Sequence, residues 1–292
     1  MRLLSLLLVL AAAVASPVRA GGTDGWTAAW APAQMVPAGD QVVPEEWLAD
    51  ATLRQVVRIG LAGSRLRLRL SNAYGTAPLA IGAVTVARSA DNRSARIQGA
   101  ALAVRFGGRP ATVIPAGAEI WSDPVDLPVS AGEDLAISIH LPGPPSPPTG
   151  HPGSRATTYF VHGDQTLAAD LAGAQTAPRW LALAGVEVFA PEARAVVAFG
   201  DSITDGYGVQ PDTNLRWTDH LAARLRTEPG MAQVAVLNAG IGGNRLLNDG
   251  LGPNSLARFE RDVLSQPGVT HLIVLEGVND LGTLTRDAPA TP

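Results

Sequence analysis

The chain has 292 residues, 46% of them hydrophobic, which is enough for one large or two ordinary domains. Its net charge of -4 gives no indication of a nucleic-acid partner or an anionic membrane surface. The absence of cysteine excludes disulfides, thiolate metal sites and a cysteine nucleophile. With 31 glycines, 23 prolines and only 16% charged residues, the composition favours a loop-rich protein with β-strands over a helical bundle.

The first 20 residues have the pattern of a signal peptide. Arg2 supplies a positive start, residues 3–15 are apolar apart from Ser5, and a small-x-small cleavage site ends at Ala20. An uncleaved anchor is the alternative, but the apolar segment is shorter than the roughly 20 residues that span a bilayer. We therefore expect a secreted or periplasmic protein, cleaved after Ala20, without stable membrane insertion.

Residues 21–190 are predicted to form a β-sandwich or jelly-roll-like domain. The run RLRLRL (65–70) alternates strictly, so its leucines share one face of a strand. Turn sequences separate it from further β-rich runs at 79–87, 102–106, 135–141 and 185–189. Several short strands without a convincing helix are typical of such domains. The proline-rich stretch 142–153 precedes the strand-like run 156–161, so we interpret it as a long loop within or beside this domain.

Residues 191–292 show a different, alternating pattern. Strands are predicted at 195–200, 234–240 and 271–277, and helices at 215–226 and 255–265, with apolar faces formed by Trp217, Leu221 and Leu225 and by Leu256, Phe259 and Val263. The order β-α-β-α-β implies a parallel sheet with right-handed crossovers, and hence an α/β fold class for this part. Polar clusters follow the three strands, at the sheet edge where ligands bind. We expect these clusters to converge on one crevice.

The three clusters carry a family resemblance. GDSITDG (200–206), NAGIGGN (238–244) and GVND (277–280) resemble, in order and context, the first three sequence blocks of the SGNH (GDSL-type) hydrolases, over roughly residues 195–282. The resemblance implies a flavodoxin-like domain and a serine esterase that acts through an acyl-enzyme, with no cofactor and no metal. The arrangement is most similar to aryl- and acetyl-esterases linked to plant-polysaccharide breakdown. An ester of a small molecule or an acetylated glycan is therefore the first expected substrate, and a lipid ester is the alternative.

The resemblance also assigns roles to residues. Ser202 would be the nucleophile, and the tetrahedral oxyanion would be met by the backbone N–H groups of Ser202 and Gly243 and by the side-chain amide of Asn279. Glycine leaves room for close substrate approach, and asparagine donates without adding charge. Asp201, Asn244 and Arg245 are candidate substrate-binding residues at the crevice rim. The alternatives are a helix cap for Ser202, an Asx turn for Asn279, loop bracing for Asp201 and a solvated loop for the other two.

The general base is the missing part of this assignment. The family carries its catalytic aspartate and histidine on a later D-x-x-H block, which this sequence does not contain. None of the five histidines has the family's position: His140, His151, His162, His220 and His271. We therefore expect a flavodoxin-like α/β domain of the SGNH type that is incomplete at its C-terminus, lacks the base that activates Ser202, and leaves its third strand as an unpaired apolar edge.

Two interpretations from other functional classes remain open. The predicted β-domain could bind carbohydrate through stacking tryptophans, although these side chains could equally lie in the core or at the domain interface. The candidates are Trp26, Trp30, Trp47, Trp121 and Trp180. The chain could also be a naturally short, non-catalytic paralogue of the hydrolases.

Overall fold

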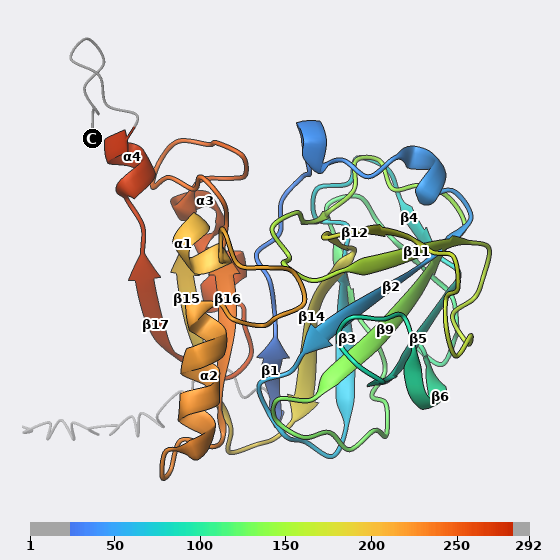
Figure 1. Ribbon diagram of the computed structural model, residues 1–292, viewed down its shortest axis with the longest axis horizontal. Helices are drawn as coiled ribbons and strands as arrows, with labels where there is room; N and C mark the ends of the chain where they lie inside the picture. Colours follow the sequence, from blue (N-terminus) through green and yellow to red (C-terminus); the bar gives the residue numbers. More distant parts are fainter. Residues whose placement is uncertain (1–23, 283–292) are drawn as a thin grey trace, which may run out of the picture.

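The computed structural model describes residues 24–282, so the predicted signal peptide and residues 283–292 lie outside the described part. The described chain forms a β-rich part that ends at Phe189 and an α/β part that begins at Arg194 (Figure 1). The boundary predicted between residues 190 and 191 falls in the short connection between them. No helix among the described residues is long and apolar enough to cross a membrane.

Two antiparallel sheets make up most of the β-rich part. The four-stranded sheet has the order β1 (Trp26–Trp30), β14 (Leu183–Phe189), β3 (Leu66–Ser71), β8 (Glu119–Trp121). The six-stranded sheet has the order β12 (Gln175–Ala177), β11 (Thr158–His162), β2 (Ala51–Arg58), β9 (Asp134–Leu141), β5 (Ala83–Ser89), β6 (Ile97–Val104). Two short pairs join β10 (Gly150–His151) to β13 (Trp180–Leu181) and β4 (Leu79–Ile81) to β7 (Thr112–Ile114). Two 3-10 turns, η1 (Gly39–Gln41) and η2 (Glu45–Trp47), lie between β1 and β2.

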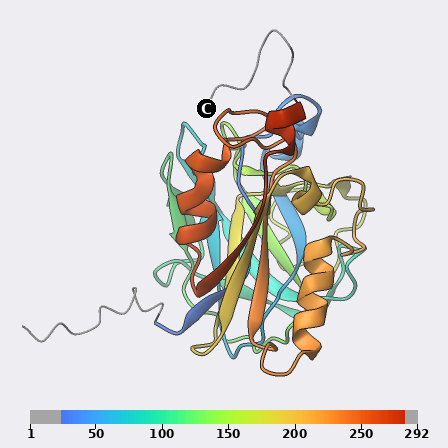
Figure 2. The same cartoon turned by 90° about the vertical axis from the view of Figure 1, so that its left-hand side faces the viewer.

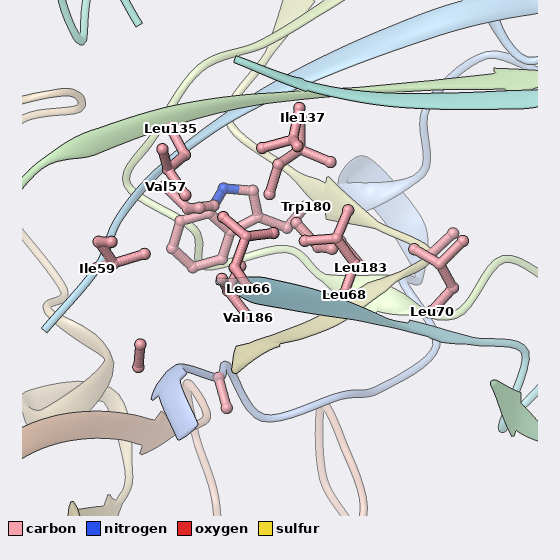
Figure 3. Packing of buried hydrophobic residues seen from close by; sticks show 14 of the residues in the cluster. Val57, Ile59, Leu66, Leu68, Leu70, Leu135, Ile137, Trp180, Leu183 and Val186 are labelled. Carbon is pink, nitrogen blue, oxygen red and sulfur yellow. The ribbon is translucent and has the colours of Figure 1, made fainter. Parts of the chain in front are cut away.

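The leucines of the alternating run lie in the core, as their period predicts. Leu66, Leu68 and Leu70 on β3 are fully buried. Figure 3 shows the first two facing side chains of the other sheet, such as Val57 and Ile137. The two sheets therefore pack face to face across one apolar cluster, which gives the β-rich part its driving force for folding.

The arginines of the same run lie on the opposite face and meet partners there. Arg67 pairs with Glu187 at 2.6 Å on the neighbouring strand. Arg69 is buried because the α/β part covers this face, and its Nη2 donates to Gln266 Oε1 at 2.8 Å. The alternating run therefore places leucines in the core between the two sheets and places arginines on the face that contacts the α/β part.

The α/β part contains a three-stranded parallel sheet, as predicted. Its order is β16 (Val234–Gly240), β15 (Arg194–Gly200), β17 (Val269–Leu275). The helices are α1 (Ser202–Asp205), α2 (Trp217–Thr227), α3 (Ser255–Phe259), which continues into the π-helical turn η3 (Glu260–Leu264), and α4 (Val278–Gly282). Figure 2 shows α2 and α3 on opposite sides of the sheet, as right-handed crossovers require. Strand β17 lies at the edge away from the β-rich part, and its residues Leu272, Ile273, Val274 and Leu275 are exposed.

The predicted apolar helix faces need correction. Trp217, Leu221 and Leu225 are only half-buried on α2, and the fully buried residue there is Thr218, whose Oγ1 accepts a hydrogen bond from Asn238. On α3 the predicted face fails at Leu256, which is 71% exposed, whereas Arg258 is completely buried. These interior positions are polar because their side chains hydrogen-bond to groups on the strands. Thr218 accepts from the Asn238 amide, and Arg258 donates to Gly200 O and Ala239 O.

The β-rich and α/β parts are joined by buried contacts as well as by the chain. Their apolar residues belong to one hydrophobic cluster. Ala28 N–H on β1 donates to Pro267 O at 2.9 Å, just before β17. His151 on β10 reaches across to Asp205 at the end of α1, with 2.8 Å between Nε2 and Oδ1. The segment that carries Ser202 is therefore held by the β-rich part.

The contact between His151 and Asp205 generates a stability prediction. His151→Phe removes both ring nitrogens and leaves the Asp205 carboxylate and Ala33 O buried without this partner. We expect the free energy of unfolding to fall by about 1–3 kcal/mol, the usual cost of leaving a buried hydrogen-bonding group without its partner. Urea titration measures this change. His220→Phe, an exposed histidine on α2, is the matched control and should stay within about 0.5 kcal/mol of the wild type. Equal effects at the two positions would contradict the prediction.

Candidate active site

The turn after β15 assigns separate tasks to Asp201 and Ser202. Asp201 is the N-cap of α1, and its Oδ1 accepts a hydrogen bond from Ile203 N–H at 2.9 Å. Ser202 is the first helical residue, and its hydroxyl and backbone N–H find no hydrogen-bond partner within residues 24–282. The capping role that could have explained the serine therefore belongs to its neighbour. Ser202 is left available for chemistry.

The end of β16 and the loop after it contain two glycines whose geometry the site requires. Gly240 passes so close to the backbone of Asp205 that a Cβ there would collide with it. Gly243 has φ +68°, a left-handed conformation that favours glycine. Its N–H finds no acceptor within the described residues. This segment therefore packs against the end of α1, and the N–H of Gly243 is a donor without a partner among the described residues.

The residues after β17 attach to the same loop. Asn279 on α4 donates one amide hydrogen from Nδ2 to Asn244 O at 2.9 Å, which leaves the second hydrogen of this amide for another acceptor. The carboxylate of Asp280 accepts a hydrogen bond from Leu246 N–H at 3.0 Å. The polar clusters behind β16 and β17 therefore meet, as their positions after neighbouring parallel strands predict.

A buried arginine connects the ends of all three strands. Arg258 is 0% exposed and lies with its guanidinium carbon 3.9 Å from the centroid of the Phe199 ring. Its acceptors are Gly200 O (3.0 Å) on β15, Ala239 O (2.7 Å) on β16, Glu276 Oε1 (3.2 Å) after β17, Asn244 Oδ1 (2.7 Å) and Asp262 Oδ2 (3.0 Å). The apolar pattern of the sequence gives no sign of this residue. Asp262, four residues later, is the one signal that could have indicated a paired arginine.

The three candidate substrate-binding residues lie in three different environments. Asp201 is buried and caps α1. Asn244 is fully buried; its Nδ2 donates to Pro253 O at 2.7 Å and its Oδ1 accepts from Arg258 and Ser255. Arg245 is half-buried and donates to Asp249 O within its own loop. In this geometry the first two brace the loops from inside.

The comparison with protein families covers this part of the chain. Residues 196–291 match the family described as GDSL-like Lipase/Acylhydrolase. The SGNH/GDSL resemblance is confirmed. The GDSL-like segment includes β15, β16 and β17 and all three polar clusters.

Solved structures similar to the chain include AlinE4, an SGNH-hydrolase family esterase, at 33% identity over 31% of this chain and 43% of that one, with a TM-score of 0.26. A family two carbohydrate esterase from Clostridium thermocellum in complex with cellohexaose is 17% identical over 78% of this chain and 63% of that one, with a TM-score of 0.26. The chain therefore spans less than half of AlinE4 and less than two thirds of the clostridial esterase. The comparison with curated proteins finds no match.

None of the five histidines hydrogen-bonds to Ser202 of the GDSL-like segment. Both ring nitrogens of His151 face acceptors, Ala33 O at 3.0 Å and Asp205 Oδ1 at 2.8 Å, so neither is free to take the serine proton. The others lie elsewhere: His140 and His162 beside Asp50, His220 exposed on α2, and His271 beside Thr270.

A cavity of about 300 Å³ lies between the GDSL-like segment and the β-rich part, lined by α2 and by Trp30 and Trp180. Two ion pairs lie in its lining, Arg58 with Asp134 at 2.6 Å and Arg216 with Asp219 at 3.1 Å. Ser202, Gly243 and Asn279 do not line it. Within residues 24–282, no group of three acidic or histidine side chains is placed to hold a metal ion.

Burial raises the pKa of Glu276 above its ordinary value of 4.5, and the neighbouring Arg258 opposes this shift. The folded protein therefore binds the proton of Glu276 more tightly than the unfolded chain does. As the pH rises through the raised pKa, the folded state loses this relative advantage.

This pKa shift predicts a pH-dependent stability difference. The unfolding free energy of the wild type minus that of Glu276→Gln should fall as the pH rises from below 4.5 through the raised value, because the glutamine does not titrate. Urea titrations of both proteins between pH 4 and pH 8 measure it. Glu260→Gln, at an exposed carboxylate of η3, controls for the loss of one negative charge. A difference that stays flat or increases with pH would contradict the prediction.

Proposed function

We propose that the GDSL-like segment carries the nucleophile and oxyanion site of a serine ester hydrolase. One observation supports this assignment above the others: Asp201 caps α1, so the Ser202 hydroxyl stands unbonded at the end of β15. The loops of Gly243 and Asn279, fastened to each other through Asn244 O, offer further unbonded donors. Fixed donors of this kind are what acyl transfer needs for its developing negative oxygen.

The proposed reaction follows from these groups. Ser202 Oγ attacks the carbonyl carbon of a carboxylic ester, and the carbonyl oxygen becomes an oxyanion that accepts from the N–H groups of Ser202 and Gly243 and the free amide hydrogen of Asn279. Collapse expels the alcohol and leaves an acyl-serine, which water hydrolyses to the carboxylic acid. A base must take the serine proton and protonate the leaving alcohol. We propose that this base is absent from the described residues.

For the substrate we propose a small-molecule ester or an acetyl ester on a glycan. A longer apolar acyl group is the second candidate, and exposed apolar side chains on the three loops favour it. They are Ile203, Tyr207, Leu246, Leu247, Leu251 and Val278. The side chain of Leu251 lies beside Gly243, where it could contact the acyl group.

The tryptophans give less support to a carbohydrate-binding module. Trp26 and Trp180 are buried, and Trp30 stacks edge-on against Trp180 at 4.8 Å between ring centroids. Trp47 packs on Phe160 at 5.8 Å. Trp121 is 42% exposed, but its Nε1 donates to Glu187. Four of the five rings therefore have packing roles within the protein.

The proposed role of Ser202 predicts slow, serine-specific chemistry. An alkyl fluorophosphonate should label the wild-type chain once, slowly, as read by intact mass, and Ser202→Ala should abolish the label. Ser265→Ala, an exposed serine after η3, should leave it unchanged. Hydrolysis of p-nitrophenyl acetate should be about 10⁴–10⁶-fold slower than by an enzyme with a complete triad.

Two outcomes would contradict this proposal in different ways. A label that survives Ser202→Ala would remove Ser202 from the role of nucleophile. Full esterase rates that Ser202→Ala abolishes would instead show that the chain does supply a base. Comparing probes with ethyl and octyl chains distinguishes the substrate classes, since faster labelling by the octyl probe would favour the apolar acyl group.

We also propose that the protein is exported and cleaved after Ala20, which predicts a mature N-terminus at Gly21. Mass spectrometry of the protein from the periplasm or medium of an expressing bacterium measures this end. Ala20→Asp should block cleavage, because the position before the cut requires a small residue. Exported protein that retains residues 1–20 would contradict the proposal.

A further inference from the structure

The guanidinium of Arg258 is saturated by its surroundings. Its five N–H groups reach acceptors on Gly200, Ala239, Glu276, Asn244 and Asp262, and the Phe199 ring packs against its face. A lysine could not replace it, because three donors on one nitrogen cannot spread in a plane toward separate strand ends. The position therefore demands the fork geometry of arginine and not merely a positive charge.

Three of these contacts lie close in sequence to a residue of the proposed site. Gly200 precedes Ser202 by two residues, Asn244 directly follows Gly243, and Glu276 precedes Asn279 by three. Asn244 extends the connection, since its backbone oxygen accepts the hydrogen bond of the Asn279 amide at 2.9 Å. One side chain thus sets the separation between the nucleophile turn and the two loops that carry the other donors.

We propose that Arg258 is a positioning residue for the oxyanion donors, holding the turn of Ser202 and the loops of Gly243 and Asn279 in register without touching the substrate. The catalytic consequence rests on the proposed serine hydrolase function, whereas the register of the loops can be tested without it. A contribution to folding stability does not by itself explain a buried arginine at this position. Buried ion pairs can often be replaced by apolar side chains with little loss of free energy of unfolding.

The chain offers a matched control in Arg261. It lies one turn further along the same helical segment and pairs with the same Asp262, at 2.9 Å. Its other partners are Tyr74 Oη at 2.7 Å and Gln34 O at 3.2 Å in the β-rich part. Arg261→Lys therefore perturbs a partly buried arginine of the same helical segment without touching the strand ends.

The first experiment measures hydrogen–deuterium exchange by peptide-resolved mass spectrometry. Arg258→Lys should speed exchange about tenfold in residues 200–206, 241–248 and 276–282, since each loop loses a buried hydrogen bond. Arg261→Lys should leave these three segments unchanged. Equal exchange in the two variants at all three segments would overturn the proposal, whether or not Ser202 reacts.

The second experiment measures the kinetics of Ser202 phosphonylation by the fluorophosphonate. Arg258→Lys should lower the maximal labelling rate about 10- to 100-fold, as expected for small misplacements of reacting groups, while the half-saturating probe concentration stays within about twofold. Arg261→Lys should change neither. A fall that appears only in the half-saturating concentration would overturn the catalytic part. No labelling of the wild type would contradict the proposed function and leave the exchange result to decide the register.

A second variant covers the case in which Arg258→Lys does not fold. Asn244→Ala removes the acceptor that joins Arg258 to the glycine loop and keeps the arginine with its strand-end carbonyls. Exchange should then rise in residues 241–248 and stay unchanged in residues 200–206. Unchanged exchange in residues 241–248 would overturn the proposal.

Discussion

One buried guanidinium, that of Arg258, donates hydrogen bonds to carbonyl oxygens at the carboxyl ends of two neighbouring parallel strands. Gly200 O and Ala239 O both face the interior beneath the loops of the site. A carbonyl oxygen can accept two hydrogen bonds, and Gly200 O also accepts from Ile241 N–H at 2.9 Å. The guanidinium of Arg258 adds a donor at each of these oxygens, and it pairs with Asp262 and Glu276 at 3.0 and 3.2 Å. The shape of the site depends on this arrangement, because the same cation also binds Asn244.

A second constraint comes from the β-rich part, which contacts the α/β part through polar groups placed by its own strand period. The alternating run on β3 sends leucines into one core and presents Arg69 to Gln266 across the boundary. Strand β10 presents His151 to Asp205 in the same way. Gln266 lies just before β17, which leads to the third polar cluster, and Asp205 lies within the first polar cluster. The β-rich part thus acts as a scaffold for the loops after β15, in addition to any binding role of its own.

Much of the fold follows from local pattern. Period-two alternation identifies β3, apolar runs identify the three parallel strands, and the polar residues after those strands indicate the site. What the sequence does not reveal are interior polar residues. Arg258 and Asn244 look like surface residues in a list of hydrophobicities, and Leu256 looks like core. Their placement depends on carbonyls and amides contributed by distant strands, which a local period cannot represent. Asp201 shows the same limit, since adjacent Asp and Ser both favour caps and only the backbone geometry separates their roles.

The pairing of β1 with β14 has a consequence for the order of assembly. The first strand of the described chain finds its partner at Leu183–Phe189, a few residues before β15 begins. The four-stranded sheet therefore cannot close until nearly all of the β-rich part has left the ribosome. Once it closes, the surface that bears His151 and Arg69 is complete just as β15 emerges. The three parallel strands, whose contacts alone span many residues of sequence, can then condense onto a finished template instead of searching for one another in solution.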